Sequence, residues 1–333
     1  MKAIRFHTHG GPEVLKLEEA PVPEPGPEQA LVRVASAGVN FIDVYQRNGL
    51  YKVTLPYTCG VEGAGVVEKV GFKVDIKPGS RVAWVMHPGA CAEFAVVPAA
   101  RLVPVPDELD FDSAAAALLQ GMTAQYLCET TYPIKHGDRA LVHAGAGGVG
   151  LLLIQMLKHK GATVFTTVST PEKAKLAQQS GADAVILYTQ EDFASRVKDL
   201  TQGEGVDVVY DSVGVETYRG GFDVLKPLGM FVLFGQSSGR VPPIDPALLA
   251  EKGSLFLTRP TLATYARDRK SLVERSGKVF GWIVEGWLHL RIGHRYPLSE
   301  TAQAYRDLES RKTTGKLILT VASIERASGR ASK

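Results

Sequence analysis

A glycine-rich turn between two apolar runs constrains the fold of this chain most strongly. Gly145, Gly147 and Gly150 have the spacing G-x-G-x-x-G, with Gly148 as a fourth glycine, and they follow the apolar run at residues 140–142. A strand before such a turn and a helix after it are the context that a dinucleotide-binding turn requires. The turn therefore predicts a diphosphate site, and the alternative is a tight strand–helix turn that binds nothing.

Strands and helices alternate on both sides of this turn. Near-continuous apolar runs are typical of parallel strands that are covered on both faces, and helical segments such as residues 171–181 separate them. The alternation predicts an α/β fold with a doubly wound, Rossmann-type nucleotide-binding domain. The expected strands are residues 139–144, 163–168, 183–188, 206–212 and 229–235.

The two ends of the chain differ from the middle in their residue pattern. Residues 1–110 contain short β-branched runs punctuated by glycine and proline, which predicts a β-rich region. After about residue 260, two helical stretches at residues 271–286 and 299–312 precede a last strand at residues 315–321. That strand could return to the N-terminal sheet, and we expect the polar residues 322–333 to form a mobile tail.

Composition excludes several functional classes. A length of 333 residues suggests about two domains, and a net charge of +3 without a basic run argues against nucleic acid or a membrane as partner. The first residues lack the apolar core of a signal peptide, and the longest apolar runs are far shorter than a bilayer span, so we expect neither a signal peptide nor a membrane span. Cys59, Cys91 and Cys128 are widely spaced without a CxxC pair, so we expect no disulfide framework and a cytoplasmic location.

The end of the second expected strand favours NADP(H) over NAD(H). An NAD site carries an acidic residue there, whereas this chain has Ser169 and Thr170, followed one helical turn later by Lys173. Hydroxyls and an ammonium bind a 2′-phosphate that a carboxylate would repel. Thr170 before Pro171 is also a good helix N-cap, and both roles are compatible. Glu172 is a mild counterargument.

Seven segments together resemble one family. In this order they resemble the zinc-free NADPH:quinone oxidoreductases, the zeta-crystallin-like family of the medium-chain dehydrogenase/reductase superfamily. The resemblance implies a GroES-like catalytic domain of residues 1–124 and 261–333, a Rossmann NADP-binding domain of residues 125–260, and a homodimer. The segments are GVNFIDVYQRNGLY (38–51), GVEGAGVVEKVG (60–71), LLQGMTAQYL (118–127), HAGAGGVG (143–150), VYDSVG (209–214), FGQSSG (234–239) and TRP (258–260).

Departures from the zinc alcohol dehydrogenases predict that this chain holds no metal. Those enzymes have a cysteine near Asn40 and a histidine before the position of Glu62, where this chain has Val61. Of their four-cysteine lobe only Cys91 is present, and zinc needs three or four protein ligands. We therefore expect reduction of an electrophilic acceptor rather than oxidation of simple alcohols.

The resemblance also implies catalytic residues. Asn40 would lie beside the nicotinamide and bond a substrate oxygen, or else serve as a turn residue. Tyr45 and Tyr51 share its segment, and Tyr51 matches a tyrosine that resembles the proton donor of related enoyl reductases. Tyr51 could equally stack on a flat quinone or simply pack. Arg259 would hold a substrate or cofactor oxygen, or close a salt bridge.

The remaining expected site residues would contact the cofactor. Alternatives stand beside two of them, since Thr123 could be a back-bonded helix threonine and Tyr188 could belong to the core. The expected contacts are Thr123, Ala146, Gly147, Gly148, Val149, Ser169, Lys173, Tyr188, Ser212, Phe234, Gly235, Ser237, Ser238 and Leu317, together with Asn40.

These residues lead to one functional hypothesis and two alternatives. The leading hypothesis is an NADPH-dependent reductase of quinones that works without zinc, with catalysis mainly by positioning. The first alternative is an NADPH-dependent reductase of α,β-unsaturated carbonyls or enoyl thioesters. The second is an NADPH-binding, crystallin-like structural protein. The sequence leaves open the natural acceptor and whether electrons pass singly or in pairs.

Overall fold

The computed structural model describes residues 1–322, which form two compact units. The β-rich unit comprises Met1–Leu118, His294–Ser310 and, within the described chain, residues 317–322, and the α/β unit comprises Leu119–Gly293 and Arg311–Lys316. The predicted boundaries at 124/125 and 260/261 stay a prediction. Compactness places residues 119–124 and 261–293 in the α/β unit.

The α/β unit is built on a six-stranded parallel sheet. Its strand order is β11-β10-β9-β12-β13-β14, and every neighbouring pair is parallel. The order reverses between β9 and β12, and ligands of such sheets bind outside the carboxyl ends at this point. The strands are β9 (Arg139–Val142), β10 (Thr163–Val168), β11 (Ala184–Leu187), β12 (Val206–Asp211), β13 (Leu225–Leu233) and β14 (Phe256–Thr258).

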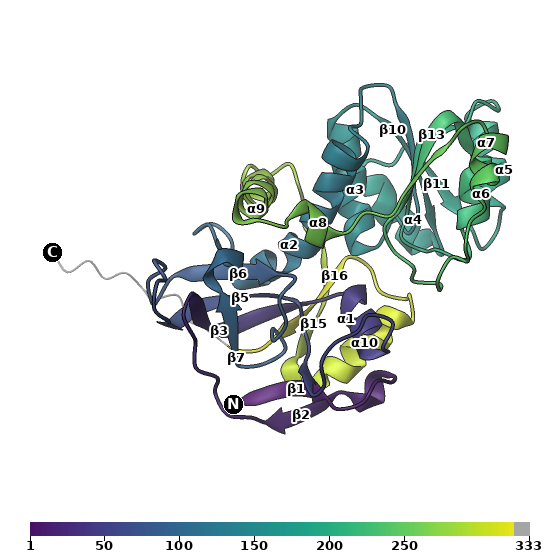
Figure 1. Ribbon diagram of the computed structural model, residues 1–333. Helices are drawn as coiled ribbons and strands as arrows, with labels where there is room; N and C mark the ends of the chain where they lie inside the picture. The colour runs from purple at the N-terminus through teal and green to yellow at the C-terminus, as the bar shows by residue number, and fades with distance from the viewer. Residues whose placement is uncertain (323–333) are drawn as a thin grey trace. The chain divides into compact units, whose positions relative to one another are not determined.

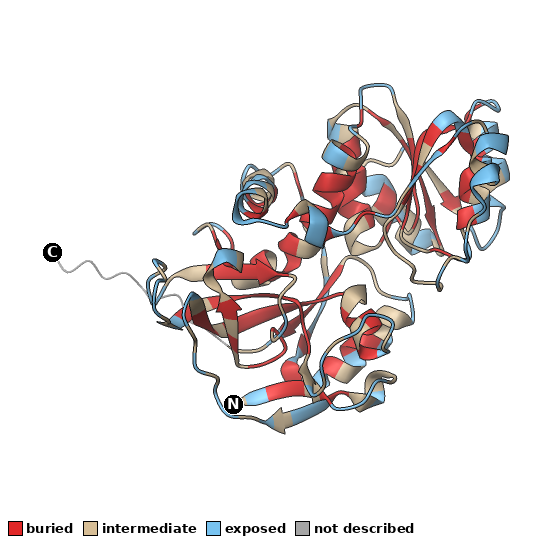
Figure 2. Cartoon of the chain, in the orientation of Figure 1, coloured by how far each residue is buried: buried red, intermediate tan, exposed pale blue. Residues whose placement is uncertain are grey.

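Helices cover both faces of this sheet (Figure 1). One face carries α3 (Gly148–His159) and α4 (Pro171–Gln179), and the other carries α5 (Phe193–Leu200), α6 (Tyr218–Asp223) and α7 (Pro246–Glu251). The central strands are buried as a result, which Figure 2 shows in red. The doubly wound fold predicted from the alternating sequence is therefore confirmed.

Three further helices lie wholly or partly in the α/β unit. They are α2 (Phe111–Tyr126), continued by a π-helical turn (Leu127–Thr131), then α8 (Leu262–Tyr265) and α9 (Arg269–Val284). Tyr126 stacks on Tyr265 with ring centroids 4.2 Å apart. A Cβ at Gly121 would lie 2.6 Å from Val279, so α2 and α9 pack closely, which is why residues 261–293 group with the α/β unit.

The β-rich unit holds a mostly antiparallel seven-stranded sheet and a small three-stranded one. The order is β15-β16-β3-β5-β6-β8, with β7 paired to β3, and β2-β1-β4 in the small sheet. The predicted return of the last strand is confirmed, because β16 pairs antiparallel with β3. The elements are β1 (Lys2–Phe6), β2 (Lys16–Glu19), β3 (Gln29–Val39), α1 (Phe41–Arg47), β4 (Tyr57–Thr58), β5 (Glu62–Val70), β6 (Arg81–Val85), β7 (Phe94–Pro98), β8 (Val103–Pro104), β15 (Ile292–Pro297), α10 (Thr301–Glu309) and β16 (Lys316–Thr320).

Two further predictions concern the C-terminal tail and membrane-spanning helices. The predicted mobile tail falls, apart from Ala322, outside the described residues. Within residues 1–322, no helix has the length and apolar character that crossing a bilayer requires.

Candidate nucleotide and substrate sites

The glycine-rich turn connects β9 to α3 as the sequence predicts. After β9 the backbone turns through Ala144 with a left-handed φ of 56°, and Gly145 N–H bonds Thr167 O at 3.1 Å. Gly147 then serves as N-cap of α3. The first N–H groups of a helix lack helical partners, and they carry the positive end of the helix dipole. This turn can therefore bind an anion.

The glycines of the turn differ in how much space a Cβ would have. A Cβ at Gly145 would overlap the Thr166 side chain, and one at Gly150 would lie 2.5 Å from Ala144 O. Both positions need glycine for packing. A Cβ at Gly147 would meet only Ala144 O, at 3.2 Å, and its φ of −76° suits any residue. The fold does not demand glycine there, whereas a diphosphate approaching the turn does.

A glutamine that the sequence did not single out lies beside this turn. A Cβ at Gly148 would overlap the side-chain amide of Gln120 in α2. Gln120 Oε1 is buried and has no hydrogen-bond partner among the described residues. Thr123, one turn further along α2, is buried as well. A glutamine inside an apolar helix carries no local signal that would have identified it.

The predicted phosphate residues meet after the second strand. Lys173 Nζ lies 3.2 Å from Ser169 Oγ, and partial burial lowers the pKa of the Lys173 ammonium below its ordinary value. Thr170 Oγ1 accepts a bond from Lys173 N at 3.3 Å, so the predicted N-cap is present too. Tyr188 follows β11 and bonds Val168 O through its N–H at 3.2 Å. Its exposed side chain starts from a position beside Ser169.

Arg311 joins this corner although the sequence gave no hint of it. Lys173 Nζ donates to Arg311 O at 2.5 Å, while the Arg311 guanidinium pairs with Glu216 at 3.0 Å and donates to Ser237 O at 3.2 Å. Two cations and a serine hydroxyl thus gather there. Glu172 opposes them, because bonds from its own N–H and from Thr170 lower the pKa of its exposed carboxyl and keep it anionic.

The loops after β12 and β13 carry the next predicted contacts, and they bond each other. Ser237 N donates to Ser212 O at 3.1 Å, and a Cβ at Gly235 would lie 2.6 Å from Ser212 O. Ser238 N bonds Val213 O at 2.8 Å, and Phe234 opens the second loop. With the glycine turn, Ser169 and Tyr188, these residues follow the carboxyl ends of adjacent strands. Arg259 follows β14 at the same edge and is exposed.

The last predicted cofactor contact is a backbone one. Gly315 N donates to Ala146 O at 2.9 Å, which places residue 315 against the glycine turn. Leu317 is the second residue of β16 and pairs with Val39, and its side chain is buried in the core of the β-rich unit. Only the main chain of Leu317 could therefore meet a ligand.

In the β-rich unit Asn40 is the best-anchored candidate. Its amide Nδ2 donates to Glu62 Oε2 at 2.8 Å and to Gly38 O at 3.2 Å, while its N–H bonds Asp43 at 3.0 Å. The side-chain amide has two donor hydrogens. A substrate oxygen would have to replace one of these bonds. The turn role, left open by the sequence, is realised in the structure.

The two predicted tyrosines lie together after Asn40. Tyr45 is buried and Tyr51 is 36% exposed, and their rings meet edge to face with centroids 5.3 Å apart. Tyr51 N–H bonds Tyr45 O at 2.8 Å. Tyr51 thus presents its ring at the surface with Tyr45 supporting it, which suits stacking on a flat ligand as well as proton delivery.

The residues that replace a zinc site are packed as ordinary core. Cys91 is buried, and a hydrogen bond with the neighbouring Cys59, together with burial, raises the pKa of its thiol. Glu62 is fully buried on Asn40, preceded by Val61. Across residues 1–322, no group of three histidine, cysteine or acidic side chains could hold a metal ion. That the protein works without zinc stays a prediction.

Comparisons with known proteins agree with this architecture. The profile described as "Alcohol dehydrogenase GroES-like domain" matches residues 26–107, and the one described as "Zinc-binding dehydrogenase" matches residues 148–267. The chain is 45% identical to a quinone oxidoreductase of Pseudomonas aeruginosa, over 96% of this chain and 99% of the relative. It is 41% identical to a 2-haloacrylate reductase of a Burkholderia species, over 95% and 98%.

A solved structure extends the agreement to three dimensions. The crystal structure of Escherichia coli quinone oxidoreductase complexed with NADPH matches with a TM-score of 0.94 and 41% identity, over 96% of this chain and all of that one. The resemblance inferred from the seven sequence segments is thereby confirmed. The chain belongs to the quinone oxidoreductase family of the medium-chain dehydrogenase/reductase superfamily.

Proposed function

We propose that this protein is an NADPH-dependent reductase of quinones that works without zinc. The observation that carries the proposal most directly is the 45% identity, over nearly the full length of both chains, to a protein named quinone oxidoreductase. The corner of Ser169, Lys173 and Arg311 supports NADPH as the reductant, because it gathers cations and a hydroxyl where a 2′-phosphate is bound in this fold. The crystal structure of the E. coli relative in complex with NADPH supports it as well.

The chain's own residues would hold the cofactor and position the acceptor. The amides of the glycine turn grip the diphosphate, and the loops after β12 and β13 hold the nicotinamide half. Bound NADPH supplies a hydride from its nicotinamide ring. Asn40 orients the acceptor, and the exposed ring of Tyr51 stacks on it or delivers a proton. These side chains raise the rate mainly by positioning.

A second candidate rests on another relative. The 2-haloacrylate reductase of Burkholderia is 41% identical to this chain, and a haloacrylate is an activated alkene. Reduction of α,β-unsaturated carbonyls or enoyl thioesters would use the same hydride donor, with the phenol of Tyr51 as proton source. The acceptor alone separates the two candidates.

Assembly and location complete the proposal. We expect a homodimer, because the edge strand β14 leaves Phe256 54% and Leu257 36% exposed and an exposed apolar edge strand invites pairing. We expect the protein in the cytoplasm, where its three cysteines, all of them free and buried, would remain thiols.

An acceptor panel assayed with NADPH and NADH tests the proposed function. Oxidation of NADPH should be fastest with quinones and slower with enones and enoyl thioesters. It should be weak when NADH replaces NADPH, since NADH lacks the 2′-phosphate that the Lys173 ammonium and the Ser169 hydroxyl would bind. Dialysis against a chelator should leave the rate unchanged, whereas a zinc-dependent enzyme would lose activity. Enones outpacing every quinone would establish the second candidate. Tight NADPH binding without turnover of any acceptor would instead indicate a structural protein.

A further inference from the structure

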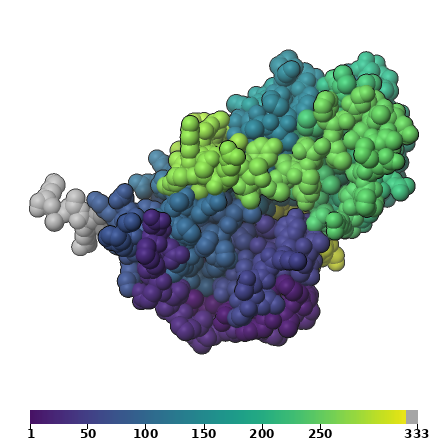
Figure 3. Space-filling model, viewed as in Figure 1, coloured from purple at the N-terminus to yellow at the C-terminus, as the bar shows by residue number. Residues whose placement is uncertain are grey.

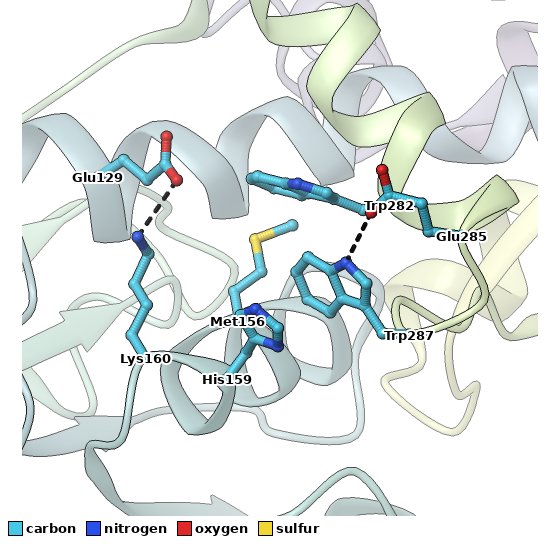
Figure 4. A pocket seen from close by; sticks show the side chains of 7 residues that line it. All are labelled: Glu129, Met156, His159, Lys160, Trp282, Glu285 and Trp287. Carbon is cyan, nitrogen blue, oxygen red and sulfur yellow. Dashed lines mark hydrogen bonds and ion pairs between the residues drawn. The ribbon is translucent and has the colours of Figure 1, made fainter.

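A cavity of the α/β unit lies away from the predicted nucleotide residues. It has a volume of about 410 Å³ and is lined by the seven side chains labelled in Figure 4. They come from the C-terminal end of α3, the π-helical turn after α2, and the end of α9. The glycine turn is at the opposite end of α3, which is 12 residues or about 18 Å long. The cavity is therefore distinct from the nucleotide turn, and its volume falls in the range of small-molecule sites.

Aromatic rings form one wall of this cavity. Trp282 of α9 and Trp287 of the following turn lie with ring centroids 5.1 Å apart, tilted by 46°. His159 stacks on Trp287 at 4.1 Å and 13°, and the thioether of Met156 points toward the indoles from α3 (Figure 4). Figure 3 shows the yellow-green residues of α9 at the molecular surface, and Trp282 and Trp287 are both partly exposed. Indole faces are the aromatic surfaces that attract cations best.

The charges of the cavity leave one carboxylate available. Glu129 pairs with two lysines, Lys160 at 3.2 Å and Lys278 at 3.1 Å, so its negative charge is more than offset and this end of the cavity is positive. Glu285 accepts a bond from the Trp287 indole at 3.3 Å, and within the described chain no lysine, arginine or histidine forms an ion pair with it. Glu285 also follows the last residue of α9, where the helix dipole is negative. The negative end of the cavity thus lies at Glu285 beside the indoles, and the lysines lie at the other end, at Glu129 (Figure 4).

We propose that this cavity binds an organic cation, namely a protonated or quaternary amine that carries an apolar group. The ammonium lies beside the Glu285 carboxylate and against the face of Trp282, because His159 already stacks on Trp287. The apolar group packs on the Met156 thioether and the edge of Trp287. A neutral compound of the same shape forfeits the attraction of the carboxylate and of the ring faces, and an anion is repelled.

Tryptophan fluorescence can detect ligand binding in this cavity. The chain has three tryptophans, and the third, Trp84, is fully buried in the β-rich unit. In the variant Trp84→Phe, only the two cavity indoles emit. Titration with benzyltrimethylammonium should give a saturable emission change at or below about 1 mM. The neutral N,N-dimethylbenzamide should bind at least about fivefold more weakly, and phenylacetate should not bind.

Two carboxylate variants in the same background locate the effect. Glu285→Gln should weaken the cation about fivefold, whereas Glu274→Gln, at an exposed glutamate of the same helix, should change nothing. Trp282→Ala should remove most of the binding. If that variant does not fold, Glu285→Gln still decides the question, because it alters charge and not packing. Saturating NADP⁺ should leave the cation affinity within about twofold.

Each opposite result overturns the proposal. Equal affinity for the cation and the neutral amide would mean that charge plays no part. An unchanged cation affinity in Glu285→Gln, or displacement of the cation by NADP⁺, would mean that it binds elsewhere. No saturable emission change with the cation would mean that the cavity has another role. None of these outcomes touches the proposed quinone reductase activity, which the acceptor panel decides on its own.

Discussion

Lys173 and Ser169 stand one helical turn apart, so their ammonium and hydroxyl face the same space at the end of the second strand. Their 3.2 Å contact and the neighbouring Arg311 carbonyl hold the ammonium in place. Partial burial lowers its pKa, which means that the charged form is poorly solvated and gains from a phosphate partner. The gain applies only to a cofactor that carries a 2′-phosphate.

Replacing this lysine should therefore separate the two coenzymes. Lys173→Ala should weaken NADPH binding at least about tenfold, since a bond between charged groups is lost, and should leave NADH binding within about twofold. Equilibrium titration of the coenzyme fluorescence measures both. Lys175→Ala is the matched control, because Lys175 lies exposed on the same helix. Equal losses for NADPH and NADH would remove the 2′-phosphate from this corner.

The glycine turn is an element whose folding and binding requirements can be told apart. A Cβ at Gly150 would lie 2.5 Å from Ala144 O, whereas a Cβ at Gly147 would press the same oxygen less closely, at 3.2 Å, on an unstrained backbone. Gly147→Val should therefore fold, with a melting temperature within about 4 °C of the parent, yet lose NADPH binding by about 100-fold because the side chain fills the diphosphate position. Gly150→Val should instead lower the melting temperature markedly. A thermal scan and an NADPH titration of each variant measure the contrast.

Two results would contradict this interpretation of the turn. NADPH affinity unchanged in Gly147→Val would mean that the diphosphate lies elsewhere. A collapse of stability in Gly147→Val, equal to that of Gly150→Val, would mean that the turn needs all its glycines for packing alone.

Elements with local signals were predictable from the sequence, and elements without them were not. The run at residues 163–168 coincides with β10 at both ends, because a buried parallel strand is written as consecutive apolar and β-branched residues. The edge strand β14 was not expected, since three residues give no periodicity. Gln120 was missed for a similar reason, because its position beside Gly148 depends on how α2 packs and not on its neighbours in sequence.

At the scale of the whole chain, the points where the chain passes from one unit back into the other determine which distant residues come into contact. Residues 311–316 belong to the α/β unit, although the chain on both sides of them belongs to the β-rich unit. This short passage brings Arg311 to Lys173 and Gly315 to the glycine turn, across separations of more than a hundred residues. Motif spacing predicts the turn itself, but only the tertiary path supplies these two partners.

The exposed edge strand of the α/β sheet predicts where two copies of the molecule would associate. Phe256 and Leu257 on β14 are exposed, and burying such an edge between two copies would shield their apolar surface and pair the strand's free backbone groups.

The purified protein should elute as a dimer in size-exclusion chromatography with light scattering. The double variant Phe256→Lys, Leu257→Lys should shift it to monomer while NADPH binding persists. Phe72→Lys is the control, because Phe72 is even more exposed, at 74%, but lies in the β-rich unit. A monomeric parent protein would contradict the homodimer, and dissociation by Phe72→Lys alone would move the interface away from β14.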